Sequence, residues 1–233
     1  MGSDSGLLGS RSSASSDRVA RSRKVIAGYG VGAHVELLAL AAHSLRPYAA
    51  RHGYDLCLET TELDPSRPAP WSKLLLIQRL LSEYECVVLI DADAVVMQHD
   101  VDIVDLVPKS ARFAMVAHTT PEGDEILNTG VMVVRRSRLA RQLIADAYSR
   151  EHLIHHKWWE NAAVLEAMGY TTEAPVILTK PTRYRRRLHL LPGEWNFIPG
   201  VSQGPARIRH YAGFTQDDRV AAMTADLHSI GLL

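Results

Sequence analysis

The sequence predicts an α/β fold with a mixed, mostly parallel central sheet flanked by helices. Two observations in the first half of the chain carry this prediction. Short apolar runs alternate with longer segments whose apolar residues recur at helical spacing, and the third run, 86–90, is apolar throughout. A continuous apolar run is expected where a parallel strand is buried on both faces. The alternation indicates a βαβαβ unit with right-handed crossovers, in which ligands bind beyond the carboxyl ends of the strands.

The individual elements follow from local patterns. The first half predicts strand 24–30, helix 34–51, strand 54–60, helix 72–85 and strand 86–90. The first helix is expected to stop at Gly53, because glycine commonly ends a helix. The second half has a looser pattern, which predicts strands 112–118, 130–135, 188–191 and 207–211, and helices 137–150, 158–168 and 217–228.

The chain is expected to form one domain, residues 23–233, because no repeat or linker interrupts it. Residues 1–22 are rich in serine and have no apolar periodicity, so a disordered tail is expected there.

Composition excludes several classes of protein. The 26 lysine and arginine residues balance 26 aspartate and glutamate residues, so no excess of basic charge is available for nucleic acid. Only Cys57 and Cys86 are present, which excludes a disulfide framework and a four-thiolate zinc site. No apolar run reaches the roughly 18 residues that a membrane span needs, and no signal peptide is recognisable. A cytoplasmic protein without a membrane span is expected.

The strongest chemical signal is the string Val87-Val-Leu-Ile-Asp-Ala-Asp-Ala94. A buried strand runs directly into two carboxylates, and residues i and i+2 of an extended chain point to the same side. Asp91 and Asp93 are therefore expected to converge on one divalent cation, such as magnesium or manganese. An isolated Asp-X-Asp can equally cap a turn, but the apolar run before it favours the metal site.

Two further strings place polar groups beside predicted strands. Asn128 and Gly130 come at the start of an apolar strand, where an amide can bind a polyol and glycine permits close approach. His210 lies near the end of a short strand, next to arginines that suit phosphate oxygens. Each string is weak alone, because Asn128 could stabilise a turn and His210 could be structural.

Taken in order, Asp91-Ala-Asp93, Asn128-Thr-Gly130, Trp195-Asn196 and His210-Tyr-Ala-Gly213 resemble motifs of metal-dependent glycosyltransferases with the GT-A fold, a Rossmann-like nucleotide-diphospho-sugar transferase fold. The resemblance is to the galactosyl/mannosyltransferase family, which includes fungal Golgi galactosyl- and mannosyltransferases and plant xylosyltransferases, with glycogenin-like features. It covers about residues 24–215.

The resemblance implies roles for particular residues. Asp91, Asp93 and His210 would bind Mn²⁺ or Mg²⁺, and Trp195 and Asn196 would contact the acceptor. The residues implied in binding the nucleotide-sugar donor, more readily a UDP-sugar than a GDP-sugar, are Ala27, Gly28, Tyr29, Lys73, Asp91, Ala92, Asn128, Gly130 and Gly213.

The sequence departs from the family at two places. Relatives commonly carry Asp-Gln beside the anomeric carbon, where Glu160 and Asn161 are the best match and are assigned the catalytic role. Gln216 stands where glycogenin-like enzymes have a lysine that binds the diphosphate. The missing cation could come from the basic segment, although such a run can also be a solvated face; its members are Lys180, Arg183, Arg185, Arg186 and Arg187.

The predicted function is transfer of a sugar from a nucleotide-sugar to a hydroxyl group of a small-molecule or glycan acceptor, with retention of the α configuration, as the resemblance implies. Two alternatives stay open. A nucleotidyltransferase also combines a nucleotide, a divalent metal and an α/β sheet, and a non-catalytic nucleotide-sugar binding module would keep the metal site without turnover.

Overall fold

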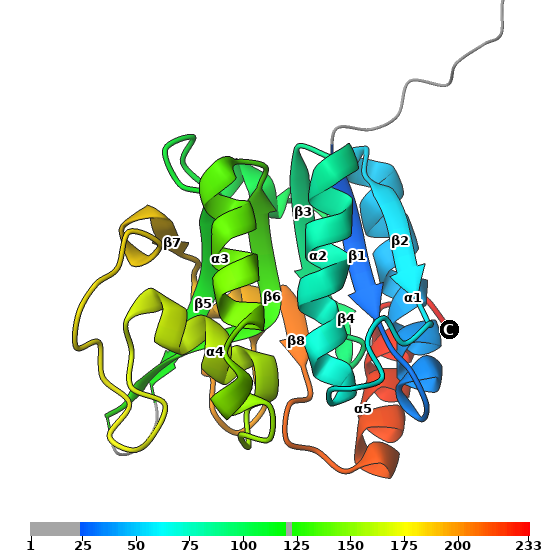
Figure 1. Ribbon diagram of the computed structural model, residues 1–233. Helices are drawn as coiled ribbons and strands as arrows, with labels where there is room; N and C mark the ends of the chain where they lie inside the picture. Colours follow the sequence, from blue (N-terminus) through cyan, green and yellow to red (C-terminus); the bar gives the residue numbers. More distant parts are fainter. Residues whose placement is uncertain (1–23, 120–122) are drawn as a thin grey trace, which may run out of the picture.

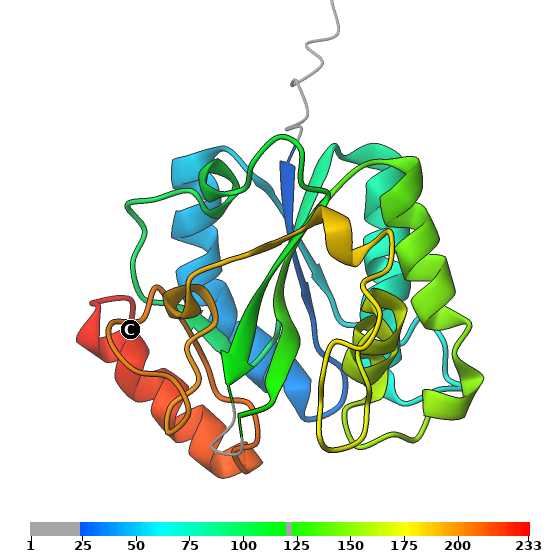
Figure 2. The ribbon, with the colours of Figure 1, turned by 90° about the vertical axis from the view of Figure 1, so that its left-hand side faces the viewer.

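The computed structural model of the protein describes residues 24–119 and 123–233. These residues form three layers, with helices on both faces of a central sheet (Figures 1 and 2). The strands are β1 (Lys24–Tyr29), β2 (Asp55–Glu59), β3 (Cys86–Ile90), β4 (Ala94–Val96), β5 (Phe113–Thr119), β6 (Glu125–Arg135), β7 (Leu188–Leu190) and β8 (Ile208–His210). The α-helices are α1 (His34–His52), α2 (Ser72–Glu83), α3 (Arg138–Tyr148), α4 (Trp159–Met168) and α5 (Gln216–Ser229). The predicted tail, residues 1–22, lies outside the described residues.

The central sheet has the strand order β2-β1-β3-β6-β5-β7. The pairs β1–β2, β1–β3 and β5–β7 are parallel, whereas β6 runs antiparallel to both of its neighbours. The predicted mixed, mostly parallel sheet flanked by helices is therefore confirmed. The carboxyl ends of β1 and β3 lie at one edge, which is where ligands bind in open α/β sheets.

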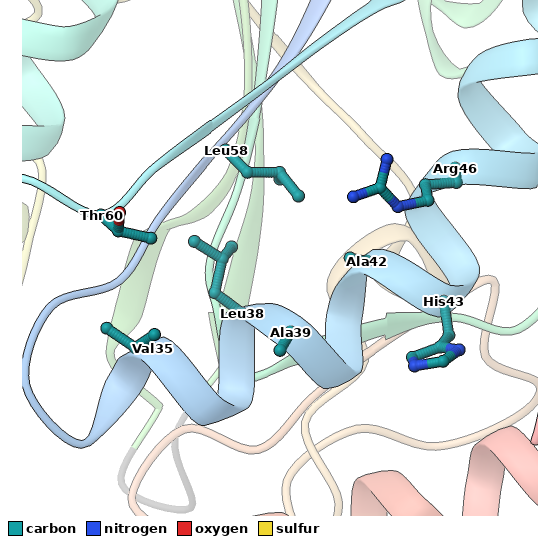
Figure 3. Close-up of a pocket in the computed structure, with 8 residues that line it drawn as sticks. All are labelled: Val35, Leu38, Ala39, Ala42, His43, Arg46, Leu58 and Thr60. Carbon is teal, nitrogen blue, oxygen red and sulfur yellow. The ribbon is translucent and has the colours of Figure 1, made fainter.

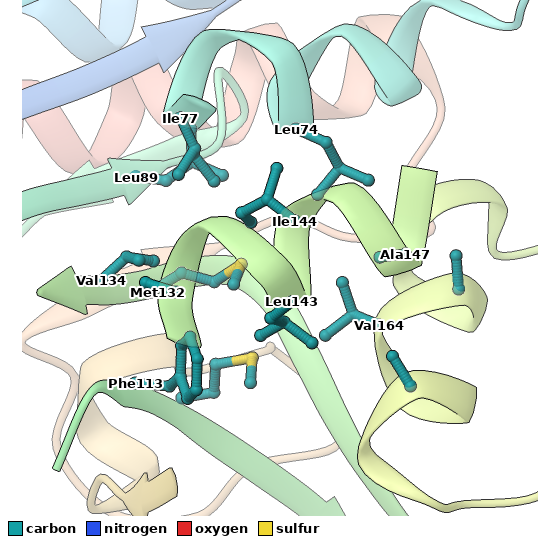
Figure 4. Packing of buried hydrophobic residues seen from close by; sticks show 14 of the residues in the cluster. Leu74, Ile77, Leu89, Phe113, Met132, Val134, Leu143, Ile144, Ala147 and Val164 are labelled. Atoms are coloured by element: carbon teal, nitrogen blue, oxygen red, sulfur yellow. The ribbon is translucent and has the colours of Figure 1, made fainter. Parts of the chain in front are cut away.

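Each face of the sheet carries its own apolar core. Helices α2, α3 and α4 cover one face, and α1 and α5 cover the other (Figure 2). In the first core, Leu74 and Ile77 of α2 and Ile144 of α3 pack over Met132 of β6 (Figure 4). The alternation of β6 explains this arrangement, because Met132 and Val134 face one core and Val133 faces the other.

The structure differs from the sequence prediction around β6. This strand begins at Glu125 rather than at residue 130, so Asn128 and Gly130 lie inside it rather than before it. The pairing of β5 with β6 shifts register between Met115 and Val116. Such a bulge changes the direction of side chains near functional sites. The pattern of apolar and polar residues in the sequence does not predict this bulge.

The sequence prediction also missed strand β4. Ala94 of β4 pairs with His210 of β8 in a separate two-stranded antiparallel sheet. The three-residue strand is too short to leave a periodic signal. Its position is nevertheless decisive, because it links the Asp91–Asp93 segment to the segment that carries His210. Among the described residues, no helix is long and apolar enough to cross a membrane.

Asp102 is hydrogen-bonded to three other residues at a place away from the predicted site. Its carboxylate accepts hydrogen bonds from Lys24 Nζ (2.6 Å), from the Tyr54 hydroxyl and from the Val104 amide (3.0 Å). Burial by itself raises the pKa of Asp102, but these three donors outweigh it and lower the pKa. The ionised form is therefore the one that stabilises the fold.

We expect Asp102→Ala to lower the free energy of unfolding by about 2–3 kcal/mol, because the buried Tyr54 hydroxyl loses its carboxylate acceptor. A lowered pKa means that this contribution is present above about pH 4 and is lost as the pH falls through the folded-state value. Denaturant titrations at neutral and acidic pH measure both effects. An equal difference between the variant and the parent at every pH would contradict the assignment.

Candidate functional site

The two carboxylates of the Asp-X-Asp string converge through a turn. Strand β3 ends at Ile90, and the chain then turns through residues 91–93 into β4. The Asp91 amide donates to the Gly130 carbonyl oxygen (2.8 Å), and the Asp93 carbonyl oxygen accepts from the Tyr211 amide (3.0 Å). Convergence was predicted, but from an extended backbone. The turn and its two anchoring bonds are the actual cause.

His210 reaches the carboxylates because β8 pairs with β4. Its Nε2 lies 3.3 Å from Asp93 Oδ1 and 3.8 Å from Asp91 Oδ2. One ligand atom from each of the three residues lies within 4.8 Å of the others. Two carboxylate oxygens and one imidazole nitrogen are a donor set that suits Mn²⁺ or Mg²⁺.

The electrostatics of this cluster favour a cation. Burial by itself raises the pKa of Asp93, but His210 and Arg219 outweigh it and hold the pKa well below its usual range. Burial by itself lowers the pKa of His210, whereas Asp93 and Asp91 raise it more. Asp93 and His210 therefore form a buried pair in which the Asp93 carboxylate is ionised and attracts positive charge at Nε2. These residues fit the divalent metal that the sequence predicts.

Lys73 lies beside this cluster and bridges two acidic residues. Its ammonium group donates to Asp91 Oδ1 (2.9 Å) and Oδ2 (3.1 Å), and it lies 2.5 Å from Glu160 Oε1. Burial by itself lowers the pKa of Lys73, but Asp91 and Glu160 outweigh it and raise the pKa. Helix α2 thus supplies a positive charge between α4 and the proposed metal-ligand group, which consists of Asp91, Asp93 and His210. The sequence analysis predicted that Lys73 binds the nucleotide-sugar donor, but it did not predict the two ion pairs that Lys73 forms with Asp91 and Glu160.

The two residues assigned a catalytic role lie under strand β6. Glu160 Oε1 accepts a hydrogen bond from the Thr129 hydroxyl (3.3 Å), and Asn161 Oδ1 accepts one from the Thr129 amide (2.8 Å). Glu160 is almost fully buried, and burial raises its pKa although Lys73 opposes the shift. The structure therefore brings α4 against the same stretch of β6 that carries Asn128 and Gly130.

Asn128 and Asn196 continue the polar network on the other face of β6. Asn128 Oδ1 accepts from the Gly130 amide (2.8 Å) and from Asn196 Nδ2 (2.9 Å). Asn196 Oδ1 lies 2.8 Å from His210 Nδ1. Trp195 and Asn196 are both 0% exposed. Their assignment to the acceptor stays a prediction that this geometry does not favour, since neither side chain has a surface that an acceptor could contact.

The remaining donor-binding assignments lie near the same edge of the sheet. Ala27, Gly28 and Tyr29 form the carboxyl end of β1. Ala27 is fully buried, and Gly28 packs so closely on α1 that a Cβ atom there would lie 2.7 Å from Leu38 Cδ1. Tyr29 is 6% exposed, and no described residue is hydrogen-bonded to its hydroxyl. Ala92 is buried in the turn between the two carboxylates. Gly213 has a φ of 82°, which a glycine adopts without strain.

Arg219 is the residue that the sequence analysis missed. It comes from α5, one helical turn after Gln216, and its Nε lies 3.1 Å from Asp93 Oδ2 and donates to the Tyr211 carbonyl oxygen (3.2 Å). No described residue accepts from its two terminal NH₂ groups, and 18% of the side chain is exposed. Two arginines of the basic segment, by contrast, pair with carboxylates outside this cluster: Arg183 contacts Asp146, and Arg185 contacts Glu125.

A surface cavity of about 390 Å³ lies apart from these residues (Figure 3). It is bounded by α1 and the edge strand β2, and its lining includes Val35, Leu38 and Leu58 together with His43 and Arg46. None of the predicted site residues lines it. The candidate site is therefore defined by the convergence of charged and polar groups rather than by this cavity.

The strand order, the Asp-X-Asp turn at the end of β3 and the histidine from the C-terminal segment together define a GT-A fold. Comparison with known proteins agrees. Residues 32–122 match the model of the galactosyl transferase GMA12/MNN10 family. An uncharacterized alpha-1,2-galactosyltransferase of Schizosaccharomyces pombe is 38% identical over 71 residues, which are 28% of this chain and 19% of that protein. The chain thus spans about a fifth of this relative.

Solved structures support the fold over most of the chain. A glycosyltransferase involved in the glycosylation of the major capsid of PBCV-1 matches 87% of this chain and 98% of its own, with a TM-score of 0.68 and 18% identity. The galactosyltransferase LgtC, solved with donor and acceptor sugar analogs, matches 89% of this chain and 96% of its own, with a TM-score of 0.55 and 12% identity. The predicted resemblance to GT-A glycosyltransferases is confirmed.

Proposed function

We propose that the protein is a metal-dependent glycosyltransferase that moves a sugar from a nucleotide-sugar donor to a hydroxyl acceptor. The observation that carries this proposal is the convergence of Asp91, Asp93 and His210 at the edge of a GT-A sheet, where their ligand atoms lie within 4.8 Å of one another. A Mn²⁺ or Mg²⁺ ion held there would neutralise charge on the diphosphate of the donor, a UDP-sugar more readily than a GDP-sugar.

The residues around the metal-ligand group have distinct tasks. Lys73 keeps Asp91 in place and, with Arg219, adds positive charge where the diphosphate departs. Two hydrogen bonds orient the Asn128 amide, and Oδ1 accepts both of them, from the Gly130 amide and from Asn196 Nδ2. Among the described residues, Nδ2 has no hydrogen-bond partner. This NH₂ group is thus available to a hydroxyl of the donor sugar.

Retention of the α configuration is part of the proposal. The acceptor hydroxyl attacks the face of the sugar from which the diphosphate departs, and a phosphate oxygen takes the hydroxyl proton. Glu160 and Asn161 adjoin the sugar-binding stretch of β6 through Thr129. They orient the sugar and stabilise positive charge that develops at the anomeric carbon.

Two alternatives make different predictions. A nucleotidyltransferase would release pyrophosphate, whereas a glycosyltransferase releases a nucleoside diphosphate. A nucleotide-sugar binding module would bind the same donor without turnover. The buried ion pair of Glu160 with Lys73 favours an enzyme, because it holds two charges beside the metal-ligand group at a high cost in desolvation.

Thermal shift with a panel of nucleoside diphosphates, each with and without manganese, tests the proposal first. A ligand at about 100 times its Kd stabilises the fold by about 2.7 kcal/mol. We expect stabilisation by one diphosphate to depend on manganese. Donor hydrolysis, measured as nucleoside diphosphate release, then separates an enzyme from a binding module. Equal stabilisation with excess chelator would contradict metal dependence.

Arg219 provides a more specific test. We expect Arg219→Gln to weaken nucleoside diphosphate binding by about 10-fold or more, since a charged donor to phosphate is lost. Binding of the nucleoside itself, which has no phosphate, should be unchanged. The matched control is Arg136→Gln, which removes an exposed arginine beside Glu85. Calorimetry with each ligand measures the difference, and parallel losses in both arginine variants would show a nonspecific charge effect.

A further inference from the structure

A chain of three hydrogen bonds leads from the backbone of β6 to the ring of His210. The Gly130 amide donates to Asn128 Oδ1 (2.8 Å), Asn196 Nδ2 donates to the same oxygen (2.9 Å), and His210 Nδ1 lies 2.8 Å from Asn196 Oδ1. Asn196 and His210 are both buried. Buried polar groups are nearly always hydrogen-bonded, so each bond of this chain needs one donor and one acceptor.

The direction of this chain is set at its first link. A backbone amide can only donate, so the atom of Asn128 that faces Gly130 must be its oxygen. The group of Asn196 that faces this oxygen must then be its NH₂ group, which leaves Asn196 Oδ1 toward the histidine. Oδ1 can only accept, so His210 Nδ1 must carry a proton. The Asp93 carboxylate also accepts, so in the metal-free ring Nε2 carries a proton as well, and a bound cation would replace that proton while Nδ1 keeps its own.

The Nε2 atom faces the two carboxylates. It lies 3.3 Å from Asp93 Oδ1 and 3.8 Å from Asp91 Oδ2. The ring packs directly against β6, because a Cβ atom at Gly130 would lie only 2.3 Å from His210 Cε1. Glycine at this position therefore allows the ring to lie against the strand, with Nε2 directed toward the two carboxylates.

We propose that Asn196 is a positioning residue that fixes a proton on His210 Nδ1, which leaves Nε2 to bind a divalent cation. The inference rests on the proposed function only for the cation itself. It assigns the amide of Asn196 to the histidine rather than to the acceptor. A bond that orients a ligand histidine through its second nitrogen typically contributes 10- to 100-fold to metal affinity.

The tautomer can be measured without any metal. A long-range ¹H–¹⁵N spectrum of the metal-free protein, recorded at a series of pH values up to alkaline pH, reports which nitrogens of His210 carry protons. We expect Nδ1–H in the parent protein. In Asn196→Ala we expect Nε2–H, the form that free histidine favours. A parent ring that has no proton on Nδ1 would overturn the inference, even if the variant did not fold.

Manganese binding gives the second readout, measured by electron paramagnetic resonance. We expect Asn196→Ala to raise the Kd for Mn²⁺ by about 10- to 100-fold. Asn196→Asp keeps an oxygen that accepts from His210 Nδ1 but sets a second acceptor against Asn128 Oδ1, so it should recover only part of the affinity. The matched control is Tyr48→Phe, which removes a buried hydroxyl bonded to the Val101 oxygen and the Ile103 amide on α1's side of the sheet. It should lower stability without changing the Kd.

The outcomes separate the two proposals. Parent protein that binds no manganese would contradict the metal site, while the tautomer would still decide the role of Asn196. Parent protein that binds manganese, with an unchanged Kd in Asn196→Ala, would overturn the positioning role and leave the proposed function intact. A loss of affinity in Tyr48→Phe equal to that in Asn196→Ala would also overturn it, because destabilisation alone would then explain the effect.

Discussion

Asp93→Ala is expected to reduce turnover by at least about 10²-fold, the scale on which loss of a preorganised electrostatic group acts. Asp93 is 7% exposed and lies between His210 and Arg219, at 3.3 and 3.1 Å. Its removal takes away a proposed metal ligand and leaves Arg219 without its carboxylate partner. Asp91→Asn is expected to weaken nucleotide binding instead, since an amide still accepts from Lys73 but carries no charge to balance the cation.

Coupled measurements separate these effects. Release of the nucleoside diphosphate gives turnover, and manganese titration gives the affinity of the site in each variant. Asp100→Ala is the matched control, because Asp100 is an exposed carboxylate paired with Arg207 and lies outside the metal-ligand group. Full activity of the parent protein in excess chelator would refute the metal dependence on which both expectations rest.

The sequence predicted the regular part of the fold well. Strand β3 and helix α1 have strong apolar patterns, and both lie within a few residues of their predicted bounds. Strand β4 was missed because it has three residues, and the beginning of β6 was missed because the bulge near Val116 has no periodic signature. Local pattern thus predicted the elements that bury whole faces, but not those fixed by pairing with distant strands.

The candidate site shows the same division. The sequence brought Asp91, Asp93 and His210 together through a resemblance, and the structure supplies the reason, which is the pairing of β4 with β8. The contacts of Arg219 with Asp93 and of Asn196 with Asn128 could not be predicted, since both join residues more than 60 positions apart. No residue type or spacing identifies which arginine or asparagine will lie there.

Helix α4 carries the second large expected effect. Glu160→Gln keeps the size of the side chain but removes the negative charge that lies 2.5 Å from Lys73. Asn161→Ala removes the oxygen that holds the Thr129 amide. Both changes act on the stretch of β6 that carries the proposed sugar contacts. We expect turnover to fall by roughly 10² or more in each variant, with nucleoside diphosphate affinity nearly unchanged.

The control for this helix is the variant Glu166→Gln. Glu166 is another carboxylate of α4, and it pairs with Arg150 and His152 away from the site. Its turnover should match the parent protein. Proton NMR of the new glycosidic linkage made from an α-linked donor tests the retaining course, and a β product would overturn it. Calorimetry with the nucleoside diphosphate tests whether binding is spared. Unchanged turnover in both Glu160→Gln and Asn161→Ala would place the catalytic face elsewhere, because these are the polar side chains through which α4 holds Thr129 beneath the proposed donor-sugar contacts.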